Sequence, residues 1–180
     1  MIIEESVLKG LYLIQPKVFQ DKRGYFFESF NQKAFNNAGL DLTFVQDNQS
    51  KSQKNVLRGL HFQLPPAAQG KLVQVIKGAV LDVAVDIRKE SDTFGHYLCL
   101  ELSEENKKML YIPQGFAHGF LTLRDETIFS YKCTDFYQPE LEAAIRWNDP
   151  DLHIDWKAED PIVSEKDQKA GAFAGFNSPF

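Results

Sequence analysis

The stretch LDVAVDIR, residues 81–88, decides the fold class of this 180-residue chain, because its apolar residues recur at every second position. A period of two is the signature of a strand with one buried face. Several short strands at close spacing predict an all-β barrel or sandwich. The other predicted strands are Lys71–Ile76, Tyr97–Leu102, Met109–Ile112, Phe116–Leu123 and Thr127–Cys133, with Lys77-Gly78 as a tight turn.

Helix signals are few. The best candidate is residues 31–40, where Asn31 is suited to cap the first turn and Gly39 lies near the end. A second short helix or turn is predicted after Ser164. The length of the chain fits a single domain over residues 1–180. The segment 170–180 is rich in Gly, Ala and Phe and lacks clear periodicity, so we expect a loosely attached tail.

Composition narrows the class of protein. The formal net charge of −5 argues against nucleic-acid binding, which relies on basic surface, but permits a small phosphorylated ligand held by a few cations. Cys99 and Cys133 lie in apolar, strand-like runs and are predicted to be buried thiols rather than a disulfide. The first residues lack the pattern of a signal peptide, and no apolar run approaches the length of a membrane span. We therefore expect a cytoplasmic protein without a membrane partner.

The first cluster of chemically useful side chains is LRGLHFQ, residues 57–63. In a regular strand, Arg58 faces one way and His61 the other. Gly59 can remove that separation, because a glycine inside a strand often marks a bend or a bulge. His61 is a candidate general base, since imidazole titrates near neutral pH. Its alternative is a structural histidine bonded to the backbone.

The second cluster is IPQGFAHGF, residues 112–120, in which Pro-x-Gly-x-x-His matches the second motif of cupin barrels. In metal-binding cupins this histidine, here His118, is a ligand beside a His-x-His pair and a glutamate. Here Gln63 stands two residues after His61, and no glutamate lies between Gln63 and Lys71. Since catalytic zinc and iron sites usually need three protein ligands, no metal is predicted. His118 remains a candidate for hydrogen bonding a ligand or for supporting the end of a barrel.

Three further side chains are suited to chemistry. Tyr131, among apolar neighbours, is either a core tyrosine or a proton donor. Lys71 begins a predicted strand, where its ammonium can meet an oxyanion or a phosphate. Asp167 can orient a histidine, as carboxylates commonly do, or it belongs to a solvated turn.

Together these segments resemble the dTDP-4-dehydrorhamnose 3,5-epimerase family. The combination is highly specific, although no single motif would be. Phe62 and Phe136 depart modestly from it, since tyrosine is equally expected there. The matching stretches, in family order, are DKRGYFFE (21–28), FVQDNQS (44–50), VLRGLHFQ (56–63), QGKLV (69–73), DVAVD (82–86), IPQGFAHGF (112–120), YKCTDFY (131–137), IRW (145–147) and SEKD (164–167).

The resemblance implies a cupin-like, jelly-roll-type antiparallel β-barrel that forms a homodimer with exchanged N-terminal strands. It implies an enzyme of dTDP-rhamnose biosynthesis that inverts carbons 3 and 5 of dTDP-4-dehydro-6-deoxy-D-glucose to give dTDP-4-dehydro-L-rhamnose. No metal or redox cofactor is implied, and the Gly-x-Gly-x-x-Gly fingerprint of a nicotinamide site is absent from the sequence.

The resemblance also implies roles for individual residues. His61 matches the base and Asp167 its support. Tyr131 matches the acid on the opposite face of the sugar ring, and Lys71 matches the group that stabilises the enolate. Arg23 and Glu28 are expected to reach a neighbouring subunit's site. The positions that match ligand contacts are Arg23, Glu28, Gln46, Asp47, Asn48, Arg58, Lys71, His118, Glu142 and Lys166.

Three alternatives share part of this pattern. A single-carbon epimerase or a ketoisomerase acting on a related dTDP-4-keto-6-deoxy sugar would share His61, while the presence of Tyr131 favours true epimerisation. A metal-dependent cupin oxygenase is disfavoured by the ligand count. A non-catalytic sugar-nucleotide sensor would bind the ligand without any exchange of substrate hydrogen with solvent.

Overall fold

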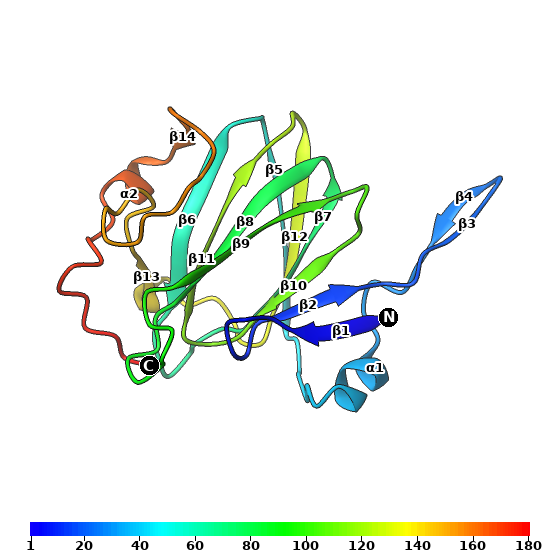
Figure 1. Cartoon of the computed structure of the whole chain (residues 1–180), viewed down its shortest axis with the longest axis horizontal. Coiled ribbons are helices and arrows are strands. Elements are labelled where there is room, and N and C mark those ends of the chain that lie inside the picture. The colour runs from blue at the N-terminus through cyan, green and yellow to red at the C-terminus, as the bar shows by residue number, and fades with distance from the viewer.

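The computed structural model describes all residues from 1 to 180, and two facing β-sheets dominate it (Figure 1). In spatial order, the first sheet contains β1 (Ile2–Glu5), β2 (Tyr12–Gln15), β10 (Met109–Ile112), β7 (Lys71–Lys77), β12 (Thr127–Cys133) and β5 (Gln46–Ser52). The second contains β13 (Glu142–Ala144), β6 (Val56–Gln63), β11 (Phe116–Thr122), β8 (Ala79–Asp86) and β9 (Tyr97–Ser103), with β14 (Ile162–Val163) beside β6.

Neighbouring strands within the sheets are antiparallel, except that β14 runs parallel to β6. The all-β, jelly-roll-type prediction is therefore confirmed, although the two sheets face each other without closing into one barrel. The turn at Gly78, where φ is +81°, leads from β7 in one sheet to β8 in the other. It therefore changes layers rather than closing a hairpin.

Local signals placed the two helices correctly. In α1 (Gln32–Asn37), the Asn31 side chain accepts a hydrogen bond from the Ala34 N–H at 3.1 Å, and Gly39 follows with φ of +81°. In α2 (Glu165–Gln168), Ser164 caps the helix in the same way through the Asp167 N–H. A 3₁₀ turn spans Pro139–Leu141. No helix is long and apolar enough to cross a membrane.

Hydrophobic contacts form three layers. One cluster fills the space between the sheets and includes Val73, Phe120 and Phe129. A second covers the outer face of the β6–β11–β8 sheet, and a third packs α1 onto the outer face of the first sheet. The alternation in residues 81–88 predicted a strand with one buried face, but β8 is buried on both faces. The chain after residue 144 supplies the second cover, which a local pattern does not reveal.

The segment 170–180 belongs to that outer cover, whereas its irregular sequence predicted loose attachment. Its three phenylalanines pack against the second sheet's outer cluster. Ser178 is buried, and the Lys89 N–H donates to the Phe180 carbonyl at 2.9 Å. The two cysteines are free, and Cys133 is buried as predicted, but Cys99 is only half-buried.

A hairpin of β3 (Phe19–Asp21) and β4 (Gly24–Phe26) projects away from the two sheets (Figure 1). It carries three exposed aromatic side chains, Phe19, Tyr25 and Phe26. Arg23 lies at its turn and pairs with Asp21 through Nη2 at 2.6 Å. The hairpin therefore presents apolar rings and a guanidinium group outside the body of its own chain.

Candidate active site

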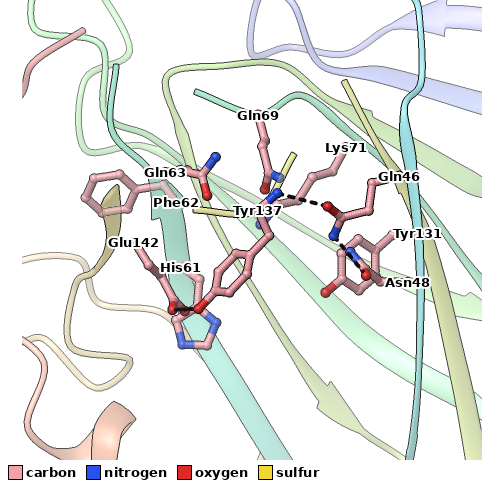
Figure 2. Close-up of a pocket in the computed structure, with 10 residues that line it drawn as sticks. All are labelled: Gln46, Asn48, His61, Phe62, Gln63, Gln69, Lys71, Tyr131, Tyr137 and Glu142. Carbon is pink, nitrogen blue, oxygen red and sulfur yellow. Dashed lines mark hydrogen bonds between the residues drawn. The ribbon is translucent and has the colours of Figure 1, made fainter. Parts of the chain in front are cut away.

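A cavity of about 290 Å³ opens between the two sheets (Figure 2). A smaller hollow of about 180 Å³ shares His61, Lys71 and Tyr131 with it, so the two form one site. The remaining lining residues of the first are Gln46, Asn48, Phe62, Gln63, Gln69, Tyr137 and Glu142, and those of the second are Gln49, Ser50, Arg58, His118, Phe120 and Phe129.

His61 projects into this site from β6 and is held by Asp167 from α2. The His61 Nε2 lies 2.6 Å from the Asp167 Oδ1. Burial raises the pKa of Asp167, but the hydrogen bond and charge of His61, with the Gly59 N–H, lower that pKa overall. An ionised carboxylate only accepts hydrogen bonds, so Nε2 carries the proton of a neutral imidazole. Nδ1 is then the unprotonated nitrogen available as a base.

A bulge in β6 brings Arg58 and His61 into the same site. His61 is opposite His118 and Arg58 is opposite Phe120, so three steps on β6 match two on β11. The extra residue reverses the alternation that would have separated the two side chains. Gly59 makes this possible, because its φ is +140° and its Cα faces the Gly119 backbone closely.

Tyr131 and Lys71 come from the sheet opposite His61. Burial raises the pKa of the Tyr131 phenol, so it stays protonated at neutral pH. Burial lowers the pKa of Lys71, although nearby anionic groups, including Glu142, oppose the change. The Lys71 Nζ lies 6.0 Å from the centre of the Tyr131 ring. A proton donor and a cation thus face the imidazole across the cavity (Figure 2).

Glu142 connects Tyr137 and Lys166 at the outer wall of the site. It accepts from the Tyr137 hydroxyl at 2.5 Å and pairs with the Lys166 ammonium. Burial raises the pKa of Glu142, but these two partners lower it overall. Since Lys166 directly precedes Asp167 in α2, the cation that pairs with Glu142 and the carboxylate that supports His61 come from one short helix.

His118 faces the inner hollow and forms a second histidine–aspartate pair. Its Nε2 lies 2.9 Å from the Asp82 Oδ2, and Asp82 is fully buried on β8. The other carboxylate oxygen of Asp82 has no hydrogen-bond partner. Each histidine of the site therefore pairs with an aspartate, and the structure contains no group of three or more His, Cys, Asp or Glu residues suited to hold a metal ion.

The structure brings most of the predicted residues together. His61, Lys71, Tyr131, Gln46, Asn48, Arg58, His118 and Glu142 line the site, with Asp167 and Lys166 directly behind it. Asp47 pairs instead with Lys132 at 3.0 Å and does not line either hollow. Arg23 and Glu28 lie on or just after the projecting hairpin, away from this chain's own cavity.

Sequence reasoning missed part of the lining. Gln63 and Gln69 belong to stretches that carry the family resemblance but are not among the candidate site residues, yet both line the larger cavity. Tyr137 also lines that cavity, although the sequence includes it only as the last residue of the stretch YKCTDFY. An isolated glutamine carries no motif, so only the folded arrangement identifies it.

Comparisons with known proteins agree over nearly the whole chain. The family model described as dTDP-4-dehydrorhamnose 3,5-epimerase matches residues 5–175. The enzyme of that name from Pseudomonas aeruginosa is 55% identical over 169 residues, covering 93% of each chain. The crystal structure of the Elizabethkingia anophelis enzyme of the same name has 51% identity, a TM-score of 0.92 and 97% coverage of both chains. The Legionella pneumophila dTDP-6-deoxy-D-glucose-3,5-epimerase, in complex with dTDP-4-keto-L-rhamnose, has 47% identity and a TM-score of 0.93, covering 98% of this chain and 94% of that one.

Proposed function

The chain belongs to the dTDP-4-dehydrorhamnose 3,5-epimerase family, and we propose that the site between its two sheets is where it carries out that family's reaction. The chain is an epimerase that inverts carbons 3 and 5 of dTDP-4-dehydro-6-deoxy-D-glucose, giving dTDP-4-dehydro-L-rhamnose. The observation that carries the proposal is that His61 and Tyr131 project into one cavity from opposite sheets.

That opposition fits the chemistry of an inversion. The hydrogens on carbons 3 and 5 are both α to the C4 ketone, so removal of either gives an enolate. Inversion then requires proton removal on one ring face and proton delivery on the other. A sugar ring lying between the sheets would present one face to the His61 imidazole and the other to the Tyr131 phenol.

Each step has a residue suited to it. His61 Nδ1 takes the proton, and the resulting imidazolium is stabilised by the Asp167 carboxylate at Nε2. Lys71 holds its ammonium beside the developing enolate oxygen. Tyr131 then delivers its proton to carbon, and the phenolate that remains faces two cations, Arg58 and Lys71. A reaction of this kind moves protons only and needs no redox cofactor.

We assign the remaining lining residues to binding. Arg58 is suited to a phosphate oxygen, as guanidinium groups commonly are. His118 and the amides of Gln46 and Asn48 can hydrogen-bond the sugar or the base. Tyr137 lines the cavity and is 48% exposed, so its aromatic ring can stack on thymine.

We also propose a homodimer in which N-terminal segments are exchanged. The projecting β3–β4 hairpin supports it, because three exposed aromatic rings on an arm outside the body call for a partner surface. Arg23 and Glu28 would then complete the neighbouring subunit's site. A cytoplasmic location stays a prediction, with which the two free thiols are compatible.

The base assignment is tested by replacing His61 with alanine. We expect turnover to be lost while the thermal unfolding temperature stays near that of the wild type, because the side chain is half-exposed at the cavity. The matched control is His96→Ala, since His96 is exposed and lies outside both hollows. Near-normal turnover in His61→Ala would show that another group is the base.

The exchanged dimer is tested by complementation. Arg23→Ala and His61→Ala are each expected to be impaired alone, but in a mixed dimer one site has an intact His61 and an intact Arg23 from the other chain. If subunits mix randomly, about half the dimers are mixed and about a quarter of all sites regain full composition. Activity of co-expressed chains no higher than the sum of the two variants would contradict shared sites.

A further inference from the structure

Three glutamine side chains around the cavity hold the backbone of one irregular segment, residues 135–138. The Gln69 Nε2 donates to the Asp135 carbonyl at 2.8 Å, and the Gln63 Nε2 donates to the Phe136 carbonyl at 2.9 Å. The Tyr137 N–H donates to the Gln46 Oε1 at 2.9 Å, and the Gln138 N–H donates to the Gln63 Oε1 at 2.8 Å. We call Gln46, Gln63 and Gln69 the glutamine clamp.

The clamp is the main restraint on this segment. Residues 135–138 follow β12 but belong to no strand. Phe136 and Tyr137 are largely exposed, and neither packs into any of the three hydrophobic clusters. Side-chain packing therefore contributes little to their position. The bonds to the glutamines hold the segment, together with the Tyr137–Glu142 contact and two local bonds, from the Phe136 N–H to the Asp135 Oδ1 and from the Leu141 N–H to the Gln138 carbonyl.

Gln63 is the centre of the clamp. Its side chain is buried, with 4% of the residue exposed, and it makes two of the four bonds. Its second N–H donates to the Ala67 carbonyl in the loop before β7. Only a primary amide of this length supplies two donors and an acceptor at once, so neither glutamate nor methionine can replace it. The same residue pairs through its backbone with Glu142 on β13 and stands two residues after His61.

We propose that Gln63 is a positioning residue that holds Tyr137 at the cavity as a preformed wall for the nucleotide part of the substrate. The proposal rests on the cavity being the dTDP-sugar site. Because Gln63 acts on the wall and not on the groups that move protons, its loss should weaken binding and leave the chemical step nearly unchanged.

The test compares Gln63→Met with the wild type by steady-state kinetics and by calorimetric titration of dTDP. We expect KM and the dTDP Kd to rise roughly 10- to 100-fold, with kcat within about threefold of the wild type. The matched control is Gln114→Met, since Gln114 donates to the Ala68 carbonyl of the same loop but has no hydrogen bond to the segment 135–138. A Gln63→Met protein that binds dTDP as tightly as Gln114→Met does would overturn the proposal.

Two further readouts separate positioning from simple destabilisation. In a Tyr137→Ala background, Gln63→Met should raise the dTDP Kd by much less than it does alone, because the wall it holds has lost its main contact. Equal effects in both backgrounds would contradict the proposal. If wild-type protein fails to bind dTDP, the proposed function fails instead.

Gln63→Glu provides a second variant should methionine prevent folding. A carboxylate repels the Phe136 carbonyl, whereas a protonated carboxyl can donate to it. The dTDP Kd of this variant, divided by that of the wild type, should therefore fall as the pH is lowered from 8 to 5. A ratio that stays constant would also overturn the proposal.

Discussion

Gly59→Ala is the substitution that most directly tests how β6 presents its side chains. A Cβ at this position would lie 2.5 Å from the Gly119 Cα and 3.1 Å from the His118 carbonyl oxygen. The backbone φ of +140° is also one that residues with a Cβ rarely adopt. Both problems arise at the bulge that places Arg58 and His61 in one site.

The expected loss in free energy of unfolding on Gly59→Ala has two contributions. An unfavourable backbone conformation costs about 1–3 kcal/mol, and a methyl group forced against a neighbouring strand costs about 1–3 kcal/mol. The sum, about 2–6 kcal/mol, is a large part of the 5–15 kcal/mol that typically stabilises a domain. The folded fraction should also lose activity by at least about tenfold, because small displacements of catalytic groups are costly.

Urea unfolding gives the free energy, and turnover per folded molecule gives the activity. The control is Gly171→Ala, because a Cβ at Gly171 meets no atom within 4 Å and its φ is not in the left-handed region. Gly171→Ala should leave both quantities close to those of the wild type. If Gly59→Ala were as stable and as active as this control, the reasoning about the bulge would be refuted.

Three further predictions concern two buried aspartates and the effect of removing metal ions. Asp167→Asn should lower kcat by roughly 10²–10⁴ with a small change in KM. If the oxygen of the introduced amide accepts from the Gly59 N–H, its NH₂ points at His61 Nε2 and favours the tautomer in which Nδ1 carries the proton. An unchanged kcat in steady-state kinetics would contradict this role of Asp167. The pKa of Asp86 is lowered to about 2, because hydrogen bonds from Arg88, Ser91 and Thr93 outweigh the effect of burial. Its unfolded pKa is near 3.9, so the carboxylate contributes about 2–3 kcal/mol that is present above about pH 4 and is lost as the pH falls through about 2. The free energy of unfolding of the wild type minus that of Asp86→Asn, measured in urea, should therefore be larger at pH 7 than near pH 2 by about 2 kcal/mol, and a difference independent of pH would contradict this reasoning. Exhaustive chelation should leave turnover unchanged, and loss of activity restored by a stoichiometric metal would revive a metal-dependent mechanism.

The strands were largely predictable, because alternation is a local signal. Residues 109–112 and 127–133 form strands with the predicted bounds, and Asn31 and Ser164 cap the helices that follow them. The burial of β8 on both faces was not predictable, since it depends on the chain beyond residue 144. The position of segment 170–180 was not predictable either, because tertiary contacts hold its phenylalanines.

The candidate site was also predictable only in part. Motifs identified His61, Lys71 and Tyr131, which the structure brings around one cavity. A glycine within a strand suggests a bulge at Gly59, but only the pairing of β6 with β11 shows that the alternation of side chains reverses there. The glutamine clamp joins residues far apart in the chain, and no local pattern relates Gln46, Gln63 and Gln69 to the segment 135–138.

The proposed mechanism requires His61 and Tyr131 to transfer protons on opposite faces of the sugar. It is tested most directly by proton NMR of dTDP-4-dehydro-6-deoxy-D-glucose with the chelator-treated protein in deuterated water. We expect deuterium at both C3 and C5 of the product, and in Tyr131→Phe a loss of substrate hydrogen that outpaces product formation. Product formed without deuterium at these carbons, or exchange that persists in His61→Ala, would contradict it.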